Sequence, residues 1–167
     1  FLSTPESIIF TDCPLSINLP LVFLQAMPVF LMQNKPTIIC KIDKATKDVT
    51  KYQADESFFV FHYGAHDENN NEINIYAPLY DKIDFSTMDI HGKYRRIRID
   101  KATGKVSILR NPELESLDVE FPITFEDKVI LRHTKGKVCD GFVIVKGLEL
   151  VRKVFLENRF VCGEQQI

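Results

Sequence analysis

Short apolar runs, many of them alternating with polar residues, recur along most of the chain and are separated by turn-forming residues. Alternation with a period of two is typical of β-strands that bury one face. Helical periodicity is weak, and two interpretations of Asp81–His91 stay open: a helical turn or two, or a loop between strands. The pattern predicts strands over Ser7–Thr11, Thr37–Ile42, Val49–Gln53, Phe58–Tyr63, Glu72–Tyr76, Tyr94–Ile99, Val106–Arg110, Lys128–Arg132, Gly141–Val145 and Val151–Leu156.

A pattern typical of a strand, a tight turn and a returning strand occurs three times in the sequence. Residues 42–49 predict a tight hairpin, residues 99–106 repeat it almost letter for letter, and residues 145–151 are a looser copy. Asp, Asn and Gly favour such turns because they tolerate left-handed backbone angles or bond their own main chain. All-β sequence that repeats every 45 to 60 residues, roughly, indicates propeller blades.

About twenty residues after each hairpin comes a short apolar run with one polar side chain. These side chains are His62, Glu120 and Glu164. The innermost strand of each propeller blade lines the central axis, so equivalent positions would converge there. One histidine and two carboxylates placed in this way would form part of a metal centre. The alternative is an ordinary β-domain with one core histidine and two surface glutamates.

Composition and charge fit a globular protein, with 167 residues, 45% hydrophobic residues and a net charge of -2. No basic surface is expected, so nucleic acid is not an expected partner. The four cysteines are widely scattered without a C-x-x-C pair. Reduced thiols and a cytoplasmic location are therefore expected.

The two ends of the sequence predict that it is a fragment of a longer protein. The chain begins at Phe1 rather than at methionine and stops at Ile167, in what resembles a strand or its approach. We expect residues 1–167 to form part of a single propeller domain that is truncated at both ends, with about three blades.

One segment, Leu19–Met32, is almost wholly apolar and contains Pro20 and Pro28. It is too short to span a membrane, and it lacks the basic leader of a signal peptide. Two interpretations stay open: a buried core segment, or an exposed loop that dips into one membrane leaflet.

Several of these runs resemble the carotenoid cleavage oxygenase family, which includes carotenoid and stilbene dioxygenases and a retinoid isomerase. Residues 58–62 resemble the strand that carries the family's third iron histidine, and residues 119–122 resemble its Glu-Phe-Pro motif. Residues 163–164 resemble the Gly-Glu before its last blade, and residues 1–10 resemble the stretch that follows its second iron histidine. The resemblance implies a seven-bladed propeller.

The resemblance also implies the roles of single residues. His62 would be one of four histidine ligands of iron(II), with Glu120 accepting a hydrogen bond from it and Glu164 supporting another ligand. The apolar loop of the family lies near the mouth of the substrate tunnel. By this resemblance Phe23, Leu24, Phe30 and Leu31 would contact a membrane, which adds peripheral membrane attachment to the expected cytoplasmic location.

The implied activity is oxidative cleavage of a conjugated double bond in a carotenoid, apocarotenoid, stilbene or related apolar polyene, with O2 and iron(II) as the only cofactor. The chain alone is expected to be inactive. The alternatives are a retinoid-type isomerase and a propeller that has lost catalysis and serves as a binding or scaffold module.

The other histidines, His66, His91 and His133, match no ligand position, and we expect all three to lie at the surface.

Overall fold

The computed structural model describes residues 1–23, 28–83, 91–136 and 138–157. Nearly all its regular structure is antiparallel β-sheet, as the sequence predicts. The strands are β1 (Leu2–Ser3), β2 (Ser7–Asp12), β3 (Leu15–Ile17), β4 (Val29–Leu31), β5 (Ile38–Asp43), β6 (Val49–Gln53), β7 (Ala65–Glu68), β8 (Glu72–Leu79), β9 (Lys93–Asp100), β10 (Val106–Leu109), β11 (Asp118–Phe125), β12 (Lys128–Lys135), β13 (Val138–Lys146) and β14 (Glu149–Phe155). Two short helices are α1 (Leu19–Phe23) and α2 (Pro112–Glu115), neither of them expected from the sequence.

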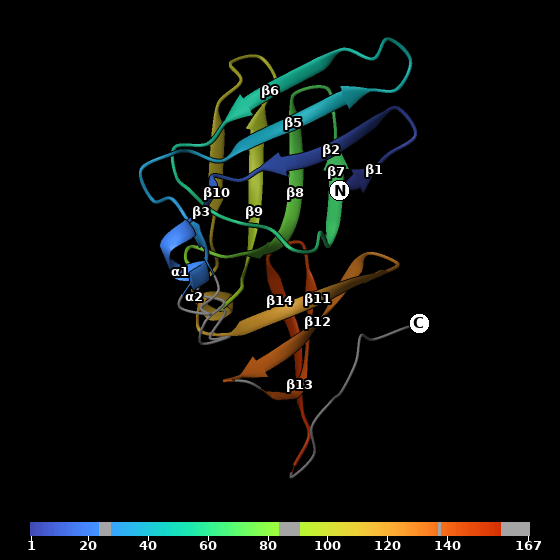
Figure 1. The fold of residues 1–167 in the computed structure, drawn as a ribbon. Coiled ribbons are helices and arrows are strands. Elements are labelled where there is room, and N and C mark those ends of the chain that lie inside the picture. The colour runs from blue at the N-terminus through green and yellow to red at the C-terminus, as the bar shows by residue number, and fades with distance from the viewer. Residues whose placement is uncertain (24–27, 84–90, 137, 158–167) are drawn as a thin grey trace.

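The strands form three four-stranded sheets in the orders β1-β2-β5-β6, β7-β8-β9-β10 and β11-β12-β13-β14. We call these the first, middle and third sheets. Each sheet follows the chain from one edge to the other, as a propeller blade does, and the three do not close into a ring (Figure 1). The hairpin of β3 and β4, with α1 between them, is inserted between β2 and β5.

The three predicted hairpins occupy equivalent places, because each joins the third and fourth strands of its sheet. Ile42 pairs with Val49, Ile99 with Val106, and Lys146 with Glu149. Lys47 and Gly104 take the same place in the first two turns, with φ of 69° and 71°. The repeat in the sequence is therefore a structural repeat.

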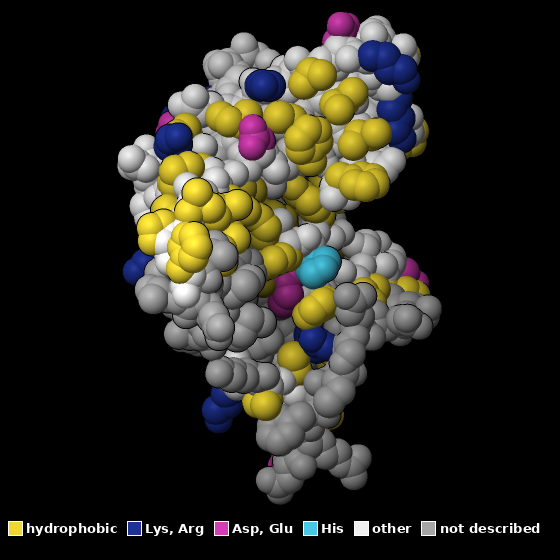
Figure 2. All heavy atoms as spheres, viewed as in Figure 1, with side chains coloured by type: hydrophobic (Ala, Val, Ile, Leu, Met, Phe, Trp, Pro, Cys, Tyr) yellow, Lys and Arg dark blue, Asp and Glu magenta, His cyan; other side chains and the backbone are white. Residues whose placement is uncertain are grey.

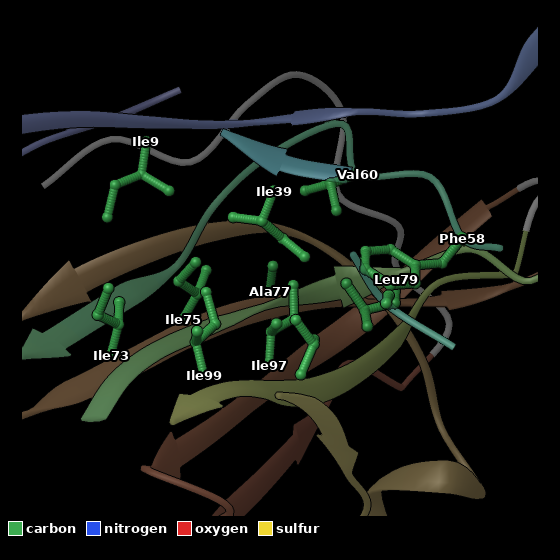
Figure 3. Packing of buried hydrophobic residues seen from close by; sticks show 12 residues of the cluster. Ile9, Ile39, Phe58, Val60, Ile73, Ile75, Ala77, Leu79, Ile97 and Ile99 are labelled. Carbon is green, nitrogen blue, oxygen red and sulfur yellow. The ribbon is translucent and has the colours of Figure 1, made fainter. Parts of the chain in front are cut away.

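The first and third sheets pack against opposite faces of the middle sheet. Its isoleucines pack against Ile9 and Ile39 of the first sheet, while Tyr76 and Tyr94 point towards the third sheet. Figure 3 shows the first of these two cores, with side chains from β8 and β9 facing Ile9, Ile39 and Val60. Strand β8 is buried along almost its whole length, which anchors both junctions.

The inserted hairpin presents an apolar face, which consists of Ile17, Leu19, Phe23 and Phe30, with exposed fractions of 61%, 67%, 87% and 40%. Hydrophobic side chains gather over α1 in Figure 2. Among the described residues of this segment, the interpretation as a core element is therefore wrong for Leu19, Phe23 and Phe30. Leu31 is buried, because neighbouring residues of β4 point to opposite sides, so its assignment to the exposed loop is corrected. Leu24 lies outside the described residues.

Within the described ranges, no helix is long and apolar enough to cross a bilayer. The segment Asp81–His91, interpreted from the sequence as a helical turn or a loop, falls largely on residues 84–90, which lie outside the described part of the chain.

Candidate metal centre

His62 lies in the extended segment that leads from β6 into β7. Phe59 forms an isolated bridge with Tyr80, and the main-chain N–H of Gly64 donates to the carbonyl of Tyr76 before β7 begins at Ala65. The predicted strand Phe58–Tyr63 is therefore wrong, since only its Phe59 pairs with a neighbour. The side chain of His62 is 44% exposed, which leaves the ring accessible from outside the sheet.

Glu120 lies near the beginning of β11, the first strand of the third sheet. The register between β11 and β12 shifts after Glu120, and Phe121 adopts a φ of 51°. Such an irregularity re-aims side chains locally. Glu120 is 8% exposed, and Phe121 lies with its ring centroid 4.9 Å from that of His62. The bulge thus brings both residues to the imidazole.

The two side chains meet: His62 Nδ1 lies 2.7 Å from Glu120 Oε1. Burial raises the pKa of the Glu120 carboxyl, while the bond to His62, the main-chain N–H of Phe121 and the Arg132 guanidinium act against this rise. An ionised Glu120 accepts a hydrogen bond and thereby holds the proton of a neutral imidazole on Nδ1. That tautomer leaves the lone pair of Nε2 for a metal.

Arg132 adds a cation to the arrangement. Its guanidinium lies 4.2 Å from the centroid of the Phe121 ring. Arg132 also pairs with Glu120 across the β11–β12 ladder. The resemblance over residues 119–122 includes Phe121 but implies no role for it or for Arg132. The Phe121 ring thus contacts both the His62 imidazole and the Arg132 guanidinium.

The donor set fits one position of an iron centre. Nδ1 of His62 faces Glu120, so Nε2 is the ring nitrogen that would bind a metal. No group of three or more His, Cys, Asp or Glu side chains arranged for a metal occurs in the ranges that the structure describes. Glu164 lies outside these ranges. The chain thus places one imidazole, with one ring nitrogen available, next to one buried carboxylate.

The remaining histidines each lie beside another carboxylate. His91 Nδ1 lies 2.8 Å from Asp118 Oδ2, and its side chain is exposed, as expected. His66 and His133 are mostly buried, with side-chain exposures of 15% and 13%, so the expectation of a surface position is wrong for both. His66 belongs to β7 rather than to a turn, and His133 packs against Phe155.

The surface is recessed between the upper and lower parts of the molecule in Figure 2, where a histidine lies beside an acidic side chain. Hydrophobic side chains line much of the surface above this recess. A polar pair next to apolar walls is the arrangement expected of a site for an apolar substrate.

Comparison with solved structures identifies the fold. A chimera of apocarotenoid oxygenase and RPE65 is 22% identical, with a TM-score of 0.69 over 88% of this chain and 35% of that one. A point variant of the Synechocystis apocarotenoid oxygenase is also 22% identical, with a TM-score of 0.67 over 87% and 35%. The lignostilbene dioxygenase of Pseudomonas brassicacearum is 12% identical, with a TM-score of 0.65 over 86% and 37%.

No protein-family profile matches the sequence. No curated protein matches it either. The matching solved structures show that the chain has the fold of carotenoid cleavage oxygenases. The chain spans about a third of the length of these structures. One matching structure is a cobalt-substituted form of the Synechocystis enzyme.

Proposed function

We propose that this chain is part of a non-haem iron(II) oxygenase that cleaves a conjugated double bond of an apolar polyene or stilbene with O2. The observation that carries the proposal is the 2.7 Å contact between His62 Nδ1 and Glu120 Oε1, which leaves Nε2 for a metal. The fold shared with an apocarotenoid oxygenase and a lignostilbene dioxygenase supports the same reaction class.

The roles of the chain's own residues follow from their positions. His62 would hold the iron through Nε2, and Glu120 would keep the Nδ1 proton in place. Phe121 and the exposed apolar residues around the recess would exclude water and receive the polyene. Iron(II) bound by neutral imidazoles supplies a centre that exchanges electrons with O2 and an electron-rich double bond.

Metal analysis of the full-length protein tests this proposal. We expect one iron per molecule in the wild type and a loss of iron in His62→Ala. His133→Ala is the matched control, because it also removes an imidazole bonded to a carboxylate, His133 Nδ1 lying 2.5 Å from Asp140 Oδ1. A wild-type protein without iron, or equal iron loss in both variants, would contradict the assignment.

We further propose that the apolar face attaches the protein to a lipid surface. Four large side chains at 40% to 87% exposure are costly in water unless another apolar phase covers them. Each contributes on the order of 1.5 to 3 kcal/mol when fully buried, enough for reversible attachment. A membrane is the natural source of a polyene substrate.

A further inference from the structure

A close approach of three chain segments occurs at Gly92, directly before β9. A Cβ atom placed on Gly92 would lie 2.6 Å from the carbonyl oxygen of Val119 and 2.8 Å from Cζ and Oη of Tyr80. The N–H of Val119 donates to the carbonyl of Gly92 at 2.9 Å. The φ of Gly92 is not positive, so the position needs glycine for space rather than for backbone freedom.

Both neighbours of Gly92 lead to the candidate metal centre. Val119 directly precedes Glu120 in β11. Tyr80 exchanges two main-chain hydrogen bonds with Phe59, of 2.9 and 3.0 Å, and its ring meets that of Phe61 edge to face at 5.0 Å. Phe61 directly precedes His62. One contact point thus touches the supports of both halves of the His62–Glu120 pair.

Two ion-pair groups hold the same junction together. Lys93 Nζ lies 2.6 Å from Asp118 Oδ1, which ties the beginning of β9 to the beginning of β11. Arg95, whose side chain is 4% exposed, binds Asp81 at 2.5 Å and Glu115 at 2.7 Å. Asp81 follows Tyr80, and Glu115 belongs to α2 just before β11. These ties join the segments that carry Tyr80, Gly92 and Val119, so a displacement at Gly92 would be expected to move these segments together.

We propose that Gly92 is a positioning residue that sets the distance between His62 and Glu120. A side chain at this position would push the Val119 carbonyl from 2.6 Å to the 3.4 Å at which ordinary contact begins, a shift of about 0.8 Å. If the pair took up this shift, the 2.7 Å hydrogen bond would lengthen to about 3.5 Å. The carboxylate would then no longer control the imidazole tautomer.

Nitrogen-15 NMR of the His62 imidazole in Gly92→Ala tests this inference without any metal. At a pH of about 8, where an ordinary imidazole is neutral, we expect the wild type to carry its proton on Nδ1. Gly92→Ala should give mixed tautomers. In the full-length protein the same variant should weaken iron binding by about 10 to 100-fold, the usual effect of losing a ligand's hydrogen-bond partner.

Gly141→Ala is the matched control. Its Cβ would clash with the carbonyl oxygen of Val154 and lie 2.9 Å from Cδ1 of Phe155, at the β13–β14 edge of the third sheet. It should destabilise the fold but leave the His62 tautomer unchanged. An unchanged tautomer in Gly92→Ala, or an equal change in both variants, would overturn the proposal.

If Gly92→Ala does not fold, Tyr80→Leu decides the question, because it removes the ring that supports Phe61 without adding an atom at Gly92. We expect mixed tautomers there too, and a wild-type spectrum would overturn the inference. This inference rests on the proposed function only where it says that the His62 tautomer serves iron binding. Absence of iron from the wild-type full-length protein would refute that function, whereas the NMR comparison would still stand or fall by itself.

Discussion

Replacing Glu120 with glutamine should separate iron binding from stability. The substitution keeps the shape of the side chain but removes the charge that accepts the bond from His62. A glutamine amide can also donate to Nδ1, which would favour the tautomer with its proton on Nε2, the nitrogen needed for iron. A charge-assisted hydrogen bond contributes about 1.5 to 3 kcal/mol and a neutral one about 0.5 to 1.5. The loss of about 1 to 2 kcal/mol corresponds to roughly 5 to 30-fold weaker iron binding.

Stability should respond in the opposite sense. Burial raises the pKa of Glu120 above its unfolded value, so the free energy of unfolding falls as the pH rises through the folded pKa. At neutral pH, glutamine removes that cost while losing part of the bond to His62. We therefore expect the melting temperature of Glu120→Gln to stay unchanged or to rise.

The assay is chelator competition for iron in the full-length protein, together with thermal unfolding of each variant. Asp140→Asn is the control, because it removes the charge from a carboxylate bonded to a different histidine, His133. Equal iron affinity in the wild type and Glu120→Gln, or an equal loss in Asp140→Asn, would refute the reasoning. A large fall in melting temperature for Glu120→Gln would show that the carboxylate serves the fold instead.

Iron retention, lipid binding and turn stability give three further predictions. The 167-residue chain should lose iron on dialysis, since one imidazole cannot compete with water, and stoichiometric tight iron in it would contradict the site assignment. Replacing Phe23 and Phe30 with serine should release the full-length protein from liposomes in co-sedimentation, with little change in melting temperature, whereas Leu31→Ser, at a buried position, should lower the melting temperature. Lipid binding retained after the replacement of Phe23 and Phe30 would refute the membrane contact. In denaturant unfolding, Lys47→Gly should stabilise the chain by about 0.5 to 1 kcal/mol and Gly104→Ala should destabilise it by about 1 kcal/mol, because both positions have positive φ; no difference between them would contradict this.

The sequence alone determined the local structure of the hairpins and the class of the fold. Each hairpin is specified by neighbouring residues, since turn geometry and strand alternation are set within a few positions. Asp43 and Asp100 accept hydrogen bonds from main-chain N–H groups in their own turns, which is why the repeat could be predicted. The spacing after the hairpins predicted that His62 and Glu120 converge, and the resemblance added the hydrogen bond between them.

Tertiary structure decided which apolar and polar side chains are covered. The exposure of Phe30 and the burial of Leu31 depend on which side of β4 faces the protein, and apolar composition is the same on both sides. His66 and His133 are mostly buried because other parts of the chain cover them, which neighbouring residues do not reveal. Gly92 is needed because Tyr80 and Val119 converge on it from different parts of the chain. Contacts between residues distant in sequence set such requirements, so they become visible only when the sheets have packed together.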